Sequence, residues 1–367
     1  MSFGLYIHIP YCLSKCRYCD FYSLGGSRQV PDAYLDALIR AWNNFAVSDL
    51  CPAGGMPRPD TLYFGGGTPS LLSPAQVERL ISFFSPAGDA EITLEANPET
   101  VNEDSLRGFR GAGVNRLSLG VQTARDDSLA RLGRPHTAAQ ARSALRAARA
   151  AGFENISGDI MLALPKYTRA EFDETLELIA GEGASHISAY LLKIEPGTAF
   201  GRRPPEGLPD EDTAADLYLY AVDRLAQEGF AQYEISNFAR PGFEGKHNLL
   251  YWNCEDYLGL GPAAHSCVGN RRFFFPGDLH NFLAGPPHPI PDGECTAEDH
   301  ILLQLRLASG LDLGELNTRY GVRFDQKQMY FLQRCQQAGY AQIDGDVVRL
   351  TPAGLIIQNS ILCELLA

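Results

Sequence analysis

The first 200 residues alternate short apolar runs with helical segments, and this alternation constrains the fold more than any other feature. Helix-start signals separate the runs, as at Ser73–Gln76, which offers an N-cap, a proline in the first turn and a capping-box glutamine. Strands that alternate with helices build a parallel sheet. Six such units are too few for an eight-fold barrel, so we predict an open, partial (β/α)6 barrel. The six runs are Gly4–Ile9, Thr61–Phe64, Glu91–Ala96, Arg116–Gly120, Ile156–Leu162 and His186–Leu192.

The remainder of the chain has a different pattern. A predicted helix over Asp210–Gly229 and a short strand over Ala231–Ile235 end the repeating part, and the proline-rich stretch Gly269–Cys295 is typical of a linker or a cover. Helical patterns then precede a hairpin turn at Asp344-Gly345-Asp346. We therefore predict an α/β protein in three parts. These are a partial barrel over 1–235, a connecting segment over 236–295, and a mostly helical, winged-helix-like domain over 296–367.

Composition narrows the function classes. The chain has 31 basic and 44 acidic residues, a net charge of −13, and such a surface repels nucleic-acid phosphates. Its last part, from Thr296 onward, carries six basic and eight acidic residues and so lacks a DNA-binding footprint. The N-terminal sequence has no signal-peptide pattern, and no run approaches the ~18 apolar residues of a membrane span. We expect a cytoplasmic protein.

A cysteine cluster directly follows the first predicted strand. Cys12, Cys16 and Cys19 form a C-x3-C-x2-C pattern, and loops after strands build the active face of an α/β barrel. Three thiolates can hold a [4Fe-4S] cluster while leaving one iron open, since no fourth cysteine is near. The amine and carboxylate of S-adenosylmethionine can chelate that iron, and an electron from the cluster can break its S–C5′ bond. We therefore predict a cluster that binds S-adenosylmethionine.

Other interpretations of the cysteines remain open. Structural zinc takes four ligands, usually from two paired knuckles; here the second knuckle is missing, although His8 could be a fourth ligand. The motif also lacks the histidine of a c-type haem attachment site. The chain has nine cysteines, an odd number that does not suggest a disulfide framework. The pattern favours one metal site in a reducing compartment.

Polar and glycine-rich positions mark the ends of the other predicted strands. A Gly65-Gly66-Gly67-Thr68 turn follows the second strand and lets a ligand approach the backbone closely. Each polar residue at the other ends could equally satisfy a structural hydrogen bond. Their shared place around one face favours a ligand. These residues are Glu95, Gln122, Arg134 and Asp159.

The chain resembles the HemN/HemW branch of radical-SAM proteins over nearly its whole length. That branch includes oxygen-independent coproporphyrinogen III dehydrogenase and haem chaperones of the HemW type. The motifs that carry the resemblance are YIHIPYCLSKCRYCDF, YFGGGTPS, LEANPE, LSLGVQ, GDIMLALP, YEISNFA, HNLLYW and YLGLGPAAHS.

The resemblance implies which residues contact S-adenosylmethionine and which branch member is nearer. The dehydrogenase pattern has a fourth cysteine where Phe21 stands here, and a longer segment before its Tyr-x-His-Ile-Pro motif than the five residues before Tyr6. These features and HNLLYW match the haem chaperones instead. The implied S-adenosylmethionine contacts are Tyr6, Tyr18, Gly66, Gly67, Thr68, Glu95, Gln122, Arg134, Asp159 and His265.

A haem site is the remaining expectation. His247 could ligate haem iron, and Tyr251 and Trp252 offer flat apolar surface, although a packed aromatic turn would show the same residues. His265 and Cys254 are reserve ligands, and Cys51-Pro52 resembles a haem-regulatory dipeptide. The function implied by the resemblance is a chaperone that carries haem to an acceptor protein, with an electron donor for the cluster. The alternative is a porphyrinogen dehydrogenase.

Overall fold

The structure is a computed structural model that describes residues 2–285 and 287–366. Its larger part is one curved sheet. The strands of that sheet are β1 (Phe3–Ile9), β2 (Thr61–Gly66), β3 (Glu91–Ala96), β4 (Arg116–Gln122), β5 (Asn155–Leu162), β6 (His186–Leu191), β7 (Ala231–Glu234), β8 (Asn237–Ala239), β9 (Asp256–Leu260), β10 (His265–Val268), β11 (Arg271–Phe274) and β12 (Ile290–Glu294). Their order across the sheet is β12-β11-β10-β9-β1-β2-β3-β4-β5-β6-β8-β7.

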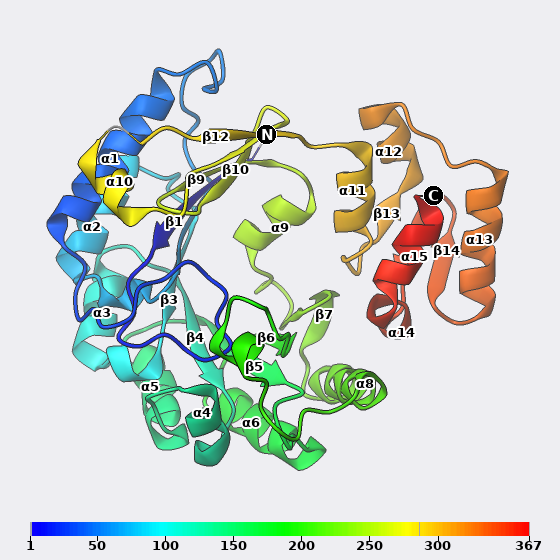
Figure 1. The fold of residues 1–367 in the computed structure, drawn as a ribbon, viewed down its shortest axis with the longest axis horizontal. Coiled ribbons are helices and arrows are strands. Elements are labelled where there is room, and N and C mark those ends of the chain that lie inside the picture. The colour runs from blue at the N-terminus through cyan, green and yellow to red at the C-terminus, as the bar shows by residue number, and fades with distance from the viewer. Residues whose placement is uncertain (1, 286, 367) are drawn as a thin grey trace.

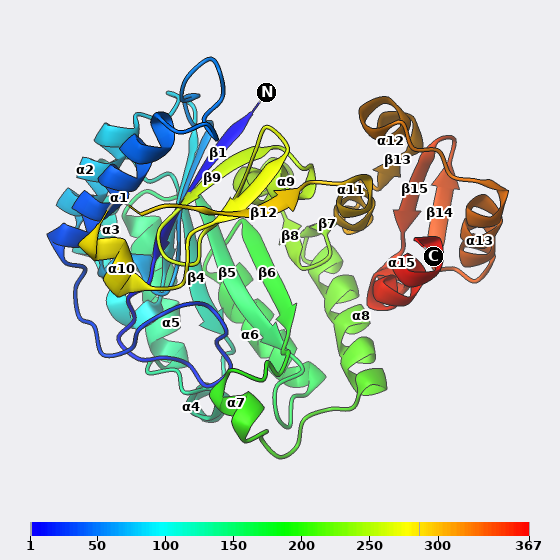
Figure 2. The same ribbon diagram turned by 45° about the horizontal axis from the view of Figure 1, so that its top comes forward.

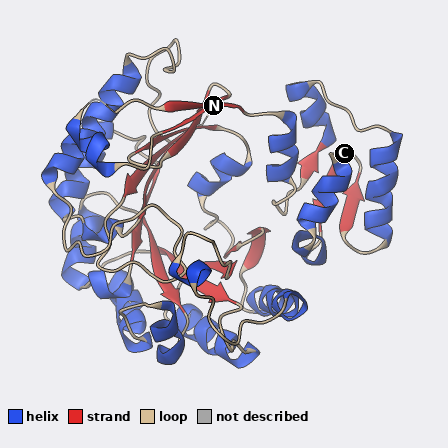
Figure 3. Cartoon of the chain, viewed as in Figure 1, coloured by secondary structure: helices blue, strands red, loops and turns tan. Residues whose placement is uncertain are grey.

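Seven adjacent strands, from β9 through β1 to β6, run parallel, and antiparallel strands extend the sheet at both ends. Helices cover its outer, convex face, and α9 lies on the inner, concave side, as Figures 1 and 3 show. The helices of this part are α1 (Asp32–Ala46), α2 (Pro74–Phe84), α3 (Glu103–Gly111), α4 (Asp126–Leu132), α5 (Ala138–Ala150), α6 (Arg169–Gly181), α7 (Ala199–Arg202), α8 (Glu211–Gln227), α9 (Lys246–Trp252) and α10 (Leu279–Ala284).

The two faces of each strand have different residues because side chains alternate along a strand. In β1, Leu5 and Ile7 are fully buried within the main hydrophobic core, which also takes in the apolar stripe of α1. Tyr6 and His8 point to the opposite face and line a cavity on the concave side. The sheet therefore separates an apolar core from a polar interior.

The connecting segment predicted over 236–295 contributes strands to the sheet. β9 pairs in parallel with β1, and β10, β11 and β12 continue the sheet from it. The proline-rich stretch predicted as a linker or cover contains β11 and β12. Pro291 lies in β12, the edge strand of the sheet, which is where proline is tolerated within a strand.

The C-terminal part has its own small hydrophobic core and stands beside the open side of the barrel (Figure 2). The predicted hairpin is present, since β14 and β15 pair around Gly345. No helix in the described part of the chain is long and apolar enough to cross a membrane. The elements of this part are α11 (Ala297–Gln304), β13 (Leu311–Asp312), α12 (Leu313–Tyr320), α13 (Gln326–Gln337), β14 (Ala341–Asp344), β15 (Val347–Leu350), α14 (Pro352–Ile356) and α15 (Gln358–Leu365).

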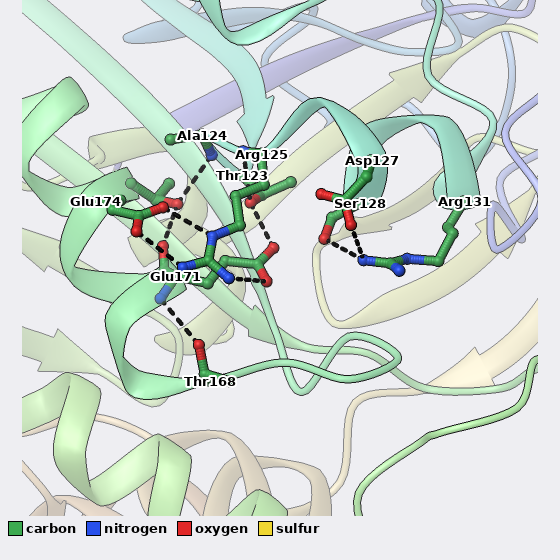
Figure 4. A network of polar contacts seen from close by, with 10 residues as sticks. Thr123, Ala124, Arg125, Asp127, Ser128, Arg131, Thr168, Glu171 and Glu174 are labelled. Atoms are coloured by element: carbon green, nitrogen blue, oxygen red, sulfur yellow. Dashed lines mark hydrogen bonds and ion pairs between the residues drawn. The ribbon is translucent and has the colours of Figure 1, made fainter.

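A polar network fixes the backbone that leaves β4 (Figure 4). The Thr123 hydroxyl donates to the buried Glu171 carboxylate at 2.7 Å, and the Ala124 N–H donates to the Thr175 hydroxyl at 3.0 Å. Arg125 forms a two-point ion pair with Glu174, with both N–O distances 2.8 Å. The network ties the residues after Gln122 to α6, and so holds one wall of the site in place.

Candidate functional site

The C-terminal ends of the parallel strands surround a cavity of about 350 Å³ on the concave face. The cysteine loop lies at its edge, and residues from β2 to β6 form its walls. Most of the predicted site residues therefore lie together although the sequence spreads them over 150 positions. Those that line this cavity are Cys12, Cys16, Cys19, Tyr18, Gly66, Gly67, Thr68, Glu95, Gln122, Arg134 and Asp159.

Backbone hydrogen bonds hold the cysteine loop, both within the loop and to neighbouring helices. The Cys12 N–H donates to the Leu24 carbonyl at 3.0 Å, closing the loop on itself. The Arg17 N–H donates to the carbonyl of Leu132 in α4 at 3.0 Å, and the Phe200 N–H donates to the Arg17 carbonyl at 2.9 Å. The loop is therefore anchored between β1, α4 and α7, so its three thiols have defined positions.

The glycine turn after β2 packs directly against this loop. A Cβ atom on Gly67 would lie 2.8 Å from the carbonyl oxygens of both Ile9 and Tyr11, and 3.0 Å from the Cys12 sulfur. The Thr68 hydroxyl donates to the same sulfur at 3.5 Å. Glycine at position 67 is thus required sterically, because any side chain would push the turn away from the cysteine loop.

A chain of hydrogen bonds joins the cysteine loop to the strand ends. The Arg134 guanidinium donates to the Tyr18 hydroxyl at 2.6 Å and to the Asn97 side-chain oxygen at 2.8 Å. Asn97 in turn donates to the Thr68 hydroxyl at 3.2 Å. Burial raises the pKa of the Cys16 thiol, whereas the positive charge of Arg134 opposes that rise. Arg134 therefore places a cation close to where a thiolate would form.

Glu95 is a buried carboxyl group with two donors. It accepts from the Tyr63 hydroxyl at 2.8 Å and from the Gly66 N–H at 3.1 Å. Burial raises its pKa to about 7, against the effect of these two hydrogen bonds. The carboxyl group is thus poised to change charge near neutral pH, and a cationic ligand would favour its ionised form.

Asp159 and Gln122 complete the far wall. Asp159 accepts a hydrogen bond from the Ser118 hydroxyl at 3.1 Å, and burial raises the pKa of its carboxyl group. Gln122 is buried with a backbone φ of 69°, where the β4–β5 register shifts. A left-handed conformation is uncommon outside glycine, and such strain concentrates at functional sites.

The three thiols line one cavity and have the chemistry that an iron–sulfur cluster takes from a protein. Among the described residues, no three His, Cys, Asp or Glu side chains are arranged to hold one metal ion. A cubane needs its three thiolates spread over separate irons, and the three thiols share one cavity wall. His8 is engaged elsewhere, through Nδ1 with the Tyr6 hydroxyl at 3.0 Å and Nε2 with the Tyr22 carbonyl at 2.8 Å. It therefore has no free nitrogen for a metal in this arrangement.

A second cavity of about 430 Å³ adjoins the first, and Gly66 and Glu95 line both. The remaining predicted residues, Tyr6, His247 and His265, line this second cavity rather than the first. Its walls are rich in aromatic rings. Those rings are Tyr6, Phe21, Tyr22, Tyr63, Tyr190, Tyr251 and Tyr257.

The two histidines of this cavity differ. His247 in α9 is buried, with Nδ1 2.7 Å from the Thr61 hydroxyl and Nε2 2.6 Å from the Tyr251 hydroxyl, and burial lowers its pKa to about 3. Its ring stacks on Tyr63 with centroids 5.0 Å apart. His265 instead is exposed and stacks on Phe274. Both ring nitrogens of His247 are therefore hydrogen-bonded, whereas the exposed His265 has its ring nitrogens available to a ligand.

Sequence reasoning missed several lining residues, among them Asn97, Arg116 and Ser118. The alternation of residues along β4 could have identified two of them. Cavity-lining residues alternate there with the fully buried Leu117, Leu119 and Val121; the lining residues are Arg116, Ser118, Gly120 and Gln122.

Cys51 lies outside both cavities. The sequence suggested a haem-regulatory dipeptide at this position, but the residue lines neither cavity, and its sulfur lies 3.6 Å from that of Met56.

Comparison with known proteins gives consistent matches. Residues 6–179 match the family model "Radical SAM superfamily", and residues 295–357 match the model "HemN C-terminal domain". The chain is 35% identical to the heme chaperone HemW of Bacillus subtilis over 97% of each chain. It is 41% identical to the heme chaperone HemW of Escherichia coli over 72% of this chain and 70% of the relative.

The fold also matches a solved structure, the radical-SAM coproporphyrinogen III oxidase HemN of Escherichia coli. The TM-score is 0.83, and the match covers 99% of this chain and 90% of that one at 24% sequence identity. This match confirms the predicted fold class.

Proposed function

This chain belongs to the HemW family of radical-SAM proteins, and from that premise we propose that it binds haem and hands it to an acceptor protein. The observation that carries the proposal is the end-to-end similarity to a curated heme chaperone, 35% identity over 97% of both chains. The aromatic cavity beside the cysteine loop supplies a place for the cargo.

In this proposal Cys12, Cys16 and Cys19 hold a [4Fe-4S] cluster, which when bound supplies an electron for cleaving S-adenosylmethionine. The cavity residues around the loop bind that cofactor. Glu95 and Asp159 would offset its positive charge, and the Gly66–Thr68 turn would contact it through its backbone, while Arg134 holds Tyr18 in the loop.

Haem enters the second cavity in this proposal. Tyrosine rings offer flat surface for a porphyrin, and either histidine can supply an axial nitrogen. His265 is available as it stands, whereas His247 must first give up a hydrogen bond to Thr61 or Tyr251. The reserve ligand Cys254 lies outside this cavity.

The second candidate is oxygen-independent coproporphyrinogen III dehydrogenase, which the HemN-like fold would also suit. The residue at the position of its fourth cysteine argues against it. Phe21 is 68% exposed at the rim of both cavities, and a phenylalanine cannot replace a thiol there. We further propose that the protein acts in the cytoplasm, together with an acceptor protein and a cellular electron donor.

Haem titration of the anaerobically reconstituted protein tests this function. We expect a Soret band with a shifted maximum, because an axial ligand changes the haem spectrum. His265→Ala and His247→Ala, each in a background that keeps its cluster, separate the two ligands. A Soret band identical to that of free haem in all three proteins would contradict the proposal.

A further inference from the structure

Three cysteines outside the candidate site form a cluster of their own. Cys254, Cys267 and Cys295 are free thiols that are 6–7% exposed and pack together with Tyr257 and Leu303. They come from the turn after α9, from β10, and from the segment that enters α11. Neither the cysteine loop nor its cavity uses them.

The cluster lines a separate cavity of about 290 Å³ that a small molecule can reach. Tyr257 and His265 border both this cavity and the aromatic one, so the thiols lie just behind the proposed haem site. Throughout the described ranges, these thiols included, no group of three metal-binding side chains closes around one ion. Two-electron oxidation needs only two adjacent thiols, so we consider redox chemistry.

Cys295 lies at the centre of the three. Its neighbours Cys254 and Cys267, which pack against it, lower the pKa of the Cys295 thiol, and the positive charge of Arg319 acts in the same direction. The pKa values of Cys254 and Cys267 are raised, first by the neighbouring Cys295 and then by burial. Cys295 is therefore the thiol that ionises first, and the thiolate is the reactive form of cysteine.

Of the two neighbours of Cys295, Cys254 is the one that lies outside a strand. Cys267 is fixed within β10, which pairs with β9 on one side and β11 on the other. Cys254 lies in a turn with a left-handed φ of 51°. Arg319 of α12 donates to the carbonyls of Asn253, at 3.0 Å, and of Cys254, at 2.5 Å, which brings the turn against the C-terminal part.

We propose that Cys295 is a peroxide-reactive thiol whose oxidation ends in a disulfide with Cys254. The Cys295 thiolate attacks one oxygen of a hydroperoxide, the O–O bond breaks, and the second oxygen leaves as alkoxide or hydroxide and takes up a proton. The Cys254 sulfur then attacks the resulting sulfenic acid, which forms the S–S bond and releases water. In total the two thiols lose two electrons, which the hydroperoxide gains. The products besides the disulfide are an alcohol and one water, or two waters when the oxidant is hydrogen peroxide.

The bond would join the end of α9 to the segment that enters α11. Because α9 carries His247 and Tyr251, the oxidised protein would hold this wall of the aromatic cavity against the C-terminal part. The site thus provides a redox-sensitive link between the two parts of the molecule.

Peptide mapping tests the proposal. The full reconstituted chain is treated with hydrogen peroxide, remaining thiols are alkylated, and disulfide-linked peptides are identified by mass spectrometry. We expect a Cys254–Cys295 peptide pair, its loss in Cys295→Ser, and in Cys254→Ser a sulfenic acid at Cys295 that dimedone traps. Cys335 is the internal control, since it is 6% exposed with a pKa raised by burial.

Three outcomes would overturn the proposal. Cys254 and Cys295 could remain as fully alkylated as Cys335, or Cys295 could stop at a sulfinic acid without a partner. A bond between Cys267 and Cys295 would refute the choice of Cys254. Peptide mapping of the chain without substitutions distinguishes these three outcomes, so the test does not depend on whether any variant folds.

Discussion

At the scale of single residues, the alternation of side chains along each strand determines what reaches the cavity. In β5, Asp159 and Met161 face the cavity, while Ile160 and Leu162 are fully buried in the core. A polar residue on such a strand looked as compatible with a structural hydrogen bond as with a ligand. Asp159 accepts a hydrogen bond from Ser118 and also faces the cavity, so one residue is compatible with both roles.

The cluster prediction concerns Cys12, Cys16 and Cys19. Replacing any one by alanine should abolish the roughly four irons and four sulfides per chain that a three-thiolate cubane site implies. Iron and sulfide analysis after anaerobic reconstitution measures this. Cys335→Ala, at a buried thiol outside the loop, should keep the full complement of iron and sulfide. An essential role for a cysteine outside the loop would contradict the open-iron arrangement.

Glu95 gives a pH prediction. Its pKa of about 7 means that the carboxyl group is mostly ionised at pH 8 and mostly protonated at pH 6. Since S-adenosylmethionine is cationic and favours the ionised form, its affinity should fall about tenfold from pH 8 to pH 6. Equilibrium binding to the cluster-loaded protein measures this. Glu95→Gln should bind more weakly at pH 8 and lose most of the pH dependence; a pH dependence unchanged by this substitution would count against Glu95 as a contact.

At the scale of elements, the glycine turn and the cysteine loop depend on one another. Gly67→Ala would place a Cβ 2.8 Å from two carbonyl oxygens, and overpacking of this kind costs about 1–3 kcal/mol. We expect a lower melting temperature together with reduced iron content. Gly88→Ala is the matched control, because its Cβ would meet nothing within 4 Å. Equal behaviour of the two variants would show that the contact is unimportant.

Helix α9 carries a separate prediction about stability. His247→Ala removes a buried ring and leaves the Thr61 and Tyr251 hydroxyls without their partner, which should cost about 3 kcal/mol. His265→Ala, on an exposed ring, should change stability by less than about 0.5 kcal/mol. Denaturant unfolding of the protein without haem measures both. Equal losses would mean that α9 packs differently.

The same helix shows where sequence reasoning stops. The HNLLYW motif pointed to a haem ligand or to a packed aromatic turn, and residue types alone could not decide between them. In the structure α9 packs against β1, β2 and β9, which come from distant parts of the chain. Only the folded arrangement brings Thr61 to His247, so no local pattern could reveal that its ring nitrogens are occupied.

At the scale of the whole molecule, the sequence predicted the β/α half well and the following segment poorly. Long apolar runs bounded by helix caps identify parallel strands, as with β3, whose bounds were predicted as observed. The strand β9, by contrast, has only five residues, two of them partly exposed, and each residue pairs with one of β1 that lies 253 positions earlier in the chain. Such a strand is defined by its neighbours rather than by its own periodicity.

One experiment tests the central claim, that this family member carries haem rather than making its precursor. The reconstituted chain is divided under anaerobic conditions. One half is titrated with haem, and the other is incubated with coproporphyrinogen III, S-adenosylmethionine and a reductant. We predict saturable haem binding with a shifted Soret band and no protoporphyrinogen IX. Cofactor-dependent formation of protoporphyrinogen IX would contradict the chaperone assignment.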